Sequence, residues 1–91
     1  MVSAFVLIHA EPRRIADLAA ELADLDGVAE VYSTAGDADI VAVVRVRDHE
    51  DLEDVVTHRL VQLDGILDTR TLIAFRAFSR HDLDAMWSLG A

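Results

Sequence analysis

The stretch Leu22-Ala-Asp-Leu-Asp-Gly-Val28 occurs a second time, in closely similar form, as Leu60-Val-Gln-Leu-Asp-Gly-Ile66. In both copies a helical spacing of apolar residues ends in Asp-Gly and gives way to a β-rich run. Glycine readily adopts the left-handed backbone that ends many helices, so Gly27 and Gly65 are expected just after two helix ends. The chain is therefore predicted to contain an internal repeat of one helix-and-strand unit.

Each copy closes a predicted amphipathic helix. The first helix is expected from Pro12 to about Asp24, because proline suits the first helical turn and apolar residues recur at helical spacing after it. The second helix is expected to follow Asp48, a favourable N-cap residue. The apolar faces of the two helices carry Ile15, Leu18, Ala19, Leu22 and Leu25 in the first, and Leu52, Val55, Val56, Leu60 and Leu63 in the second.

Four β-rich runs flank these helices, over residues 4–9, 28–34, 40–44 and 67–75. The first and third runs are apolar on both faces, which is typical of central strands, whereas the other two mix polar and apolar positions, as edge strands do. The order β-α-β-β-α-β predicts an α+β, ferredoxin-like sandwich with a four-stranded antiparallel sheet. Right-handed crossovers place both helices on one face of that sheet.

The second face of the predicted sheet is too apolar to be left in water. Phe5, Leu7, Val41 and Val43 alternate with a second apolar set, and only one set can face the helices. Large exposed apolar patches mark interfaces. A second copy is expected to cover this face, in a dimeric α/β barrel-type association. The alternative is a short C-terminal helix over about 79–89, with Leu83, Met86 and Trp87 on one side.

Length and composition bound the remaining possibilities. The 91 residues are expected to form one domain, with a core over 3–78 and no disulfide because cysteine is absent. The net charge of -9, with all eight cations spread along the chain as arginines, argues against direct nucleic-acid binding. No apolar run approaches the roughly 20 residues of a membrane span, and no signal peptide is recognisable, so a cytoplasmic protein is expected.

Catalytic and metal-binding patterns are weak. His9, His49, His58 and His81 lie on separate predicted elements, whereas a zinc site needs three or four converging ligands. No serine stands in a Gly-x-Ser-x-Gly turn and no glycine-rich phosphate loop is present. We therefore expect no enzyme, no metal and no cofactor.

The segment Gly36-Asp-Ala-Asp39 has two interpretations. Glycine and aspartate are turn residues, so the segment is explained as the hairpin between the second and third strands, and composition alone favours this interpretation. The functional interpretation is that backbone N–H groups of such a turn hold a carboxylate while aspartate side chains hold an ammonium. A zwitterionic amino acid requires both kinds of contact.

The whole pattern resembles the effector-binding domain of the Lrp/AsnC regulators. The resemblance rests on Gly36-Asp-Ala-Asp39 before an apolar strand together with the two helix-ending Asp-Gly-Val/Ile segments, and it extends to about Phe78. It implies a fold that dimerises through its sheet, dimers joined into rings of eight or ten, and an amino acid or related small molecule bound between dimers. Full-length members also carry a helix-turn-helix, and this chain looks like a stand-alone form that could pair with a full-length regulator.

Carried over by position, the resemblance implies ligand-binding roles for Gly36, Asp37, Asp39, Asp68, Thr69 and Thr71. Position 38, often aromatic in the motif, is Ala38 here, which bears on the effector's identity. Two alternatives remain: a small dimeric α+β barrel enzyme, monooxygenase-like, with a polar cavity around His9, and an ACT-type amino-acid-binding domain. The loop from His9 to Arg14 lacks the glycine that ACT relatives use.

Overall fold

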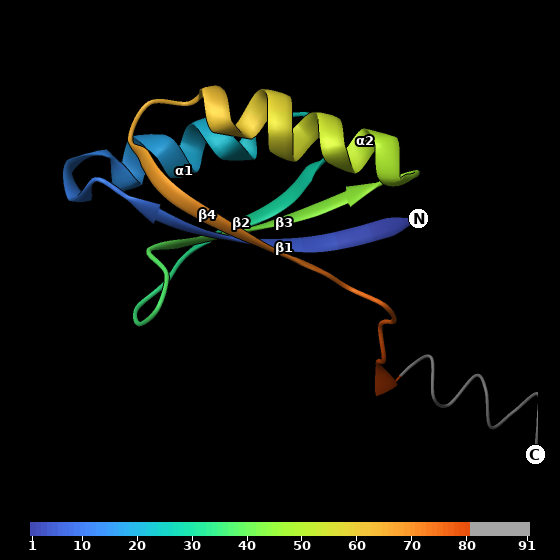
Figure 1. The fold of residues 1–91 in the computed structure, drawn as a ribbon. Helices are drawn as coiled ribbons and strands as arrows, with labels where there is room; N and C mark the ends of the chain where they lie inside the picture. The colour runs from blue at the N-terminus through green and yellow to red at the C-terminus, as the bar shows by residue number, and fades with distance from the viewer. Residues whose placement is uncertain (81–91) are drawn as a thin grey trace, which may run out of the picture.

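Strands and helices alternate in the predicted order along residues 1–80, which are the residues that the computed structural model describes (Figure 1). The strands are β1 (Val2–Ala10), β2 (Val28–Ser33), β3 (Ile40–Val46) and β4 (Ile66–Ile73). They form one antiparallel sheet in the order β2-β3-β1-β4, so the doubly apolar strands β1 and β3 are central and the mixed strands β2 and β4 are edges, as predicted. This is the ferredoxin-like arrangement.

The first helix begins with a short 3₁₀ turn, η1 (Pro12–Arg14), and continues as α1 (Ile15–Ala23), close to its predicted limits. Leu18 and Leu22, one helical turn apart, are fully buried against the sheet. Gly27 follows the helix with φ +93°, in the left-handed region expected from the sequence.

The second helix begins where Asp48 predicts it. The Asp48 Oδ1 atom accepts a 2.9 Å hydrogen bond from the backbone N–H of Asp51, an N-cap contact that satisfies one of the free donors of the first turn. The helix starts as α2 (His49–Glu53), widens to π-helical geometry in η2 (Asp54–Arg59) and tightens to the 3₁₀ turn η3 (Leu60–Gln62). In Figure 1 the three segments follow one another as a single rod beside α1.

Both helices cover one face of the sheet (Figure 1), called here the inner face. Ala4, Val6 and Ile8 of β1 point to it and are fully buried, as are Ile40, Ala42 and Val44 of β3. No polar or charged residue of the described chain is buried. The core is therefore held by apolar contact between sheet and helices, and polar chemistry is left to the surfaces.

The opposite, outer face carries the other alternating set, which contains Phe5, Leu7, Val41 and Val43. Phe5 of β1 lies between Val43 of β3 and Leu72 of β4 in the strand register. Phe5 is 42% exposed and Leu72 51%. Tyr32 of β2, opposite Val41, is 50% exposed. Within the described part of the chain no helix covers this face (Figure 1).

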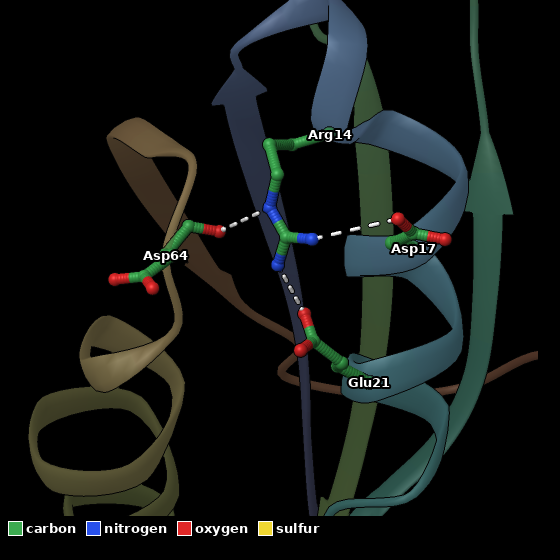
Figure 2. A network of polar contacts seen from close by, with 4 residues as sticks. All are labelled: Arg14, Asp17, Glu21 and Asp64. Atoms are coloured by element: carbon green, nitrogen blue, oxygen red, sulfur yellow. Dashed lines mark hydrogen bonds and ion pairs between the residues drawn. The ribbon is translucent and has the colours of Figure 1, made fainter.

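Arg14 connects the beginning of the first helix to the end of the second (Figure 2). Its Nε–H donates to the carbonyl oxygen of Asp64 at 3.4 Å, and its guanidinium pairs with Glu21 at 2.6 Å and Asp17 at 3.6 Å. A Cβ atom added to Gly65, which has φ +98°, would lie 2.8 Å from the Arg14 Cβ. The second glycine of the repeat is thus needed both for its backbone and for the space beside Arg14.

The C-terminal helix predicted over about 79–89, with Leu83, Met86 and Trp87, falls on residues 81–91 apart from its first two positions. It therefore lies outside the described residues, as does His81, and it stays a prediction.

Candidate functional site

Residues 34–39 form the connection between β2 and β3, which leaves the sheet on the side away from the helices (Figure 1). Its base is closed by two hydrogen bonds: the Thr34 N–H donates to the Asp39 carbonyl at 2.9 Å, and the Thr34 hydroxyl donates to the Ala38 carbonyl at 2.8 Å. Gly36 has φ +111°, which confirms the predicted turn. Apart from Gly36 and its two chain neighbours, no heavy atom of residues 1–80 lies within 4 Å of a Cβ built at Gly36, so the tip of the hairpin is open.

Asp39 fixes the base of this hairpin to the end of β1. Its Oδ2 accepts a 2.9 Å hydrogen bond from the Ala10 N–H, and its own N–H donates to the Ile8 carbonyl at 2.9 Å. Within residues 1–80 nothing donates a hydrogen bond to Oδ1. The Asp39 carboxylate therefore has one oxygen committed to the fold and one available at a half-exposed surface.

His9 lies beside Asp39 on the outer face. The His9 Nδ1 atom is 3.9 Å from Asp39 Oδ2, and the two side chains are 50% and 39% exposed. On the other side of His9, the strand register places Asp68 of β4 directly opposite it. Residues directly opposite on paired strands point to the same face. Asp39, His9 and Asp68 therefore form a row across the sheet, called here the acidic row.

Thr69 and Thr71 lie on the other side of β4. They are opposite Ile8 and Val6, whose side chains point to the inner face, and both threonines are half-buried. A single chain therefore separates the predicted site residues into three places: Gly36 and Asp37 at the exposed hairpin tip, Asp39 and Asp68 in the acidic row, and the two threonines toward the helices.

His9 was not predicted to lie beside the predicted site residues. The only indication in the sequence is strand alternation, which puts His9 on the same side of β1 as Phe5 and Leu7.

The enzymatic alternative requires His9 to point into a polar cavity between sheet and helices. Strand alternation prevents this, because the adjacent Ile8 and Ala10 are buried on the inner face. The described chain buries no polar residue that could line such a cavity.

Ala38, at the position that is often aromatic in the resembling motif, is 5% exposed. Its small side chain is therefore not presented at the tip of the hairpin. The exposed residues at the tip are Ala35, Gly36 and Asp37.

A separate open pocket of about 300 Å³ lies at the end of β3 away from the hairpin, where that strand meets the second helix. Its charged residues are Asp26, Arg47, Asp51, Asp54 and Arg59, and an ion pair of 2.9 Å joins Arg59 to Asp54. None of the predicted site residues lines it. Residues 1–80 contain no group of three or more potential ligands placed to hold a metal ion, and no helix among them could span a bilayer.

A second polar cluster on the outer face lies on β2 and β3 and contains Tyr32, Glu30 and Arg45. The Tyr32 hydroxyl donates a hydrogen bond to Glu30, whose carboxylate also accepts one from Arg45 at 3.2 Å. These contacts, that of Tyr32 above all, lower the pKa of Glu30 below its ordinary value. The same bond to Glu30 raises the pKa of Tyr32. Charged and aromatic side chains thus border the apolar centre of the outer face.

The described residues define a ferredoxin-like α+β domain with an apolar core, an uncovered apolar sheet face and polar groups gathered at a hairpin outside the core. The chain belongs to the Lrp/AsnC ligand binding domain family, whose model matches residues 3–83.

The chain is similar to several regulators and solved structures. It is 32% identical over 59 residues to the HTH-type transcriptional regulator LrpA of Pyrococcus horikoshii, a match that covers 65% of this chain and 42% of that protein. The crystal structure of TTHA0845 from Thermus thermophilus is 49% identical, with a TM-score of 0.82, and the match covers 88% of this chain and 100% of that one.

A feast or famine regulatory protein from M. tuberculosis, solved in complex with L-methionine, is 32% identical with a TM-score of 0.73. That match covers 87% of this chain and 53% of the solved one. The chain spans about half the length of the curated relatives it matches.

Proposed function

We propose that this chain is a non-enzymatic regulatory module that forms oligomers and binds an amino acid or a related small effector at subunit interfaces. The observation that carries the proposal is the hairpin around Gly36, which is open at its tip while Asp39 is held at its base with one carboxylate oxygen available. An open turn of this kind can hold a carboxylate on backbone N–H groups, and Asp39 can hold an ammonium.

The distribution of the predicted site residues supports an interface site. Asp68 points to the outer face, whereas Thr69 and Thr71 point toward the helices. One ligand cannot contact all of these groups within one chain. Because β4 is an edge strand, a neighbouring subunit can approach it and bring its hairpin to the threonines. The complete site of Gly36, Asp37, Asp39, Asp68, Thr69 and Thr71 is thus proposed to be shared between subunits.

The outer face supports the dimer that such an assembly requires. Phe5 on the central strand β1 and its partner Leu72 on the edge strand β4 are about half exposed in a single chain, and both belong to an apolar sheet surface. Exposed apolar patches of this kind mark association surfaces. A second copy is proposed to cover the face in the dimeric α/β barrel-type association, with dimers joined into octamers or decamers.

The relatives support the regulatory role. The L-methionine complex of the M. tuberculosis protein places an amino acid on a similar fold, and the Pyrococcus relative is a transcriptional regulator. We propose that residues 1–91 form one cytoplasmic domain that pairs with a full-length Lrp/AsnC regulator and does not itself contact nucleic acid or membrane.

The test combines light scattering with calorimetry. Light scattering should give a mass of at least a dimer of dimers. Titration with the proteinogenic amino acids should give binding by at least one of them, and Asp37→Ala, which changes an exposed residue at the hairpin tip, should weaken it. Asp17→Ala is the matched control, because Asp17 is exposed on α1. A mass no greater than that of a dimer, or a panel without any binding, would refute the proposal.

A further inference from the structure

The acidic row contains a titratable residue that the proposed site does not yet use. His9 lies between two carboxylates: Asp39 Oδ2 is 3.9 Å from its Nδ1 atom, and Asp68 is its cross-strand partner. Half of the His9 side chain is exposed, on the same side of the sheet as the open hairpin. An imidazole in this position can contact the same ligand group as its two neighbours.

We propose that His9, Asp39 and Asp68 together form the ammonium-binding end of the effector site, with His9 adjusting affinity according to its charge. The proposal rests on the proposed function. Because Asp39 Oδ2 already accepts from the Ala10 N–H, the ligand's ammonium is held by Asp39 Oδ1 and by Asp68, with His9 between them. The effectors selected are therefore molecules with a free amine, as distinct from carboxylic acids alone.

The charges around His9 determine the direction of the pH effect. Asp39 faces it from the β3 side and Asp68 from β4, while Asp37 in the hairpin and Glu11 just after β1 add negative charge nearby in the chain. The cation on this face closest in register is Arg70, opposite Leu7.

When His9 is neutral, the two carboxylates are free to attract an ammonium. When His9 is protonated, its N–H group competes for Asp39 and its charge repels the ligand. Histidine side chains change charge between about pH 5 and pH 8. Effector affinity is therefore expected to fall with decreasing pH, and effector binding should release a proton where His9 is partly protonated.

The test is calorimetry at about pH 6 and about pH 8 on the intact protein, with the tightest-binding amino acid of the panel and its deaminated analogue. We expect about two- to fivefold weaker binding of the amino acid at the lower pH, as for a partly exposed ion pair. The analogue, which lacks the ammonium, should bind more weakly than the amino acid at about pH 8 and show no such loss at about pH 6. Repeating the titration at the lower pH in two buffers of different ionisation enthalpy measures the proton released.

Two variants separate this inference from the proposed function. His9→Gln should remove both the pH dependence and the proton release, whereas His58→Gln, which changes an exposed histidine of the second helix, should keep both. Binding that is equal at the two pH values, or a pH dependence that persists in His9→Gln, would overturn the inference and leave the proposed function standing. The absence of amino-acid binding at either pH would overturn both.

Discussion

The backbone N–H of Ala10 donates a 2.9 Å hydrogen bond to Asp39 Oδ2, so the last residue of β1 is tied to the base of the β2–β3 hairpin. Asp39 therefore has a structural role that does not depend on a ligand. A substitution at Asp39 changes the position of the hairpin as well as its charge, and experiments at this residue need to separate the two effects.

Asp39→Asn keeps an oxygen that can accept from Ala10, whereas Asp39→Ala removes it. We expect Asp39→Ala to lower the free energy of unfolding by about 1 to 2 kcal/mol, as for a hydrogen-bond donor left unsatisfied, and Asp39→Asn to lower it by less than half of that. Urea denaturation followed by circular dichroism measures both. Equal losses in the two variants would contradict the assigned hydrogen bond.

Alanine substitutions at Gly36 and Gly65, which both have positive φ, distinguish the cost of backbone strain from the cost of a steric clash. Gly36→Ala is expected to cost about 1 to 2 kcal/mol, the cost of left-handed backbone alone, because the space beside it is open. Gly65→Ala should cost at least about 1 kcal/mol more, since the added Cβ would lie 2.8 Å from the Arg14 Cβ. Thermal or urea unfolding of the two variants gives the comparison, and equal stabilities would show that Arg14 yields without cost.

The outer face should control the oligomeric state. Phe5→Glu places a carboxylate at the centre of the apolar face, and its burial in a dimer carries a large desolvation cost. We expect the dissociation constant of the dimer to rise by at least about 100-fold, so that light scattering at micromolar concentration finds monomers. Ala20→Glu, at an exposed position of α1, is the control and should leave the mass unchanged. A Phe5→Glu protein of unchanged mass would place the interface elsewhere.

The pKa of Glu30 should change when either of its hydrogen-bond partners, Tyr32 or Arg45, is replaced. The lowered pKa of Glu30 arises first from the Tyr32 hydrogen bond and second from Arg45. Tyr32→Phe should therefore raise the Glu30 pKa toward its ordinary value, and by more than Arg45→Gln does. Side-chain NMR titration measures both shifts, and the reverse order would contradict the assignment.

The lowered pKa of Glu30 determines how its contribution to the free energy of unfolding changes with pH. A carboxyl group whose pKa is lower in the folded state stabilises that state above its unfolded pKa, and this contribution is lost as the pH falls through the folded value. Acid unfolding of Tyr32→Phe should consequently show a weaker dependence on pH over that range than unfolding of the parent protein.

Much of the fold follows from local patterns in the sequence. The N-cap role of Asp48, the left-handed glycines at 27 and 65, and the central position of β1 and β3 each follow from a side chain or an alternation that acts within a few residues. The π-helical segment η2 was not predictable in this way. Apolar residues that recur only every four positions, as Leu52, Val56 and Leu60 do, fit an α-helix and a locally widened turn alike.

The candidate site was less predictable, because it depends on strand register. Asp68 and Thr69 are adjacent in the sequence, and alternation alone separates their faces. Which of them shares a face with His9 depends on the pairing with β1, which shifts between His9 and Ala10. A register irregularity of this kind inverts the assignment of faces and leaves no clear signature in composition. The sequence puts His9 in the same alternating set as Phe5 and Leu7, but only the packing of the helices on the other set shows that this set faces outward.

The sheet also determines where another protein can be attached to this domain. Val2, at the start of β1, pairs with Val46, and Ile73, at the end of β4, pairs with Ala4. The hairpin adjoins the pair Ile8 and Ile40, at the other end of β1. The start of β1 and the end of β4 therefore lie at the end of the sheet away from the hairpin. Across the length of β1 this is a separation of about 25 Å. A fluorescent label or a fused reporter at Val2 will therefore lie far from the acidic row, so a sensor for the proposed effector can be assembled without obstructing the residues proposed to bind it.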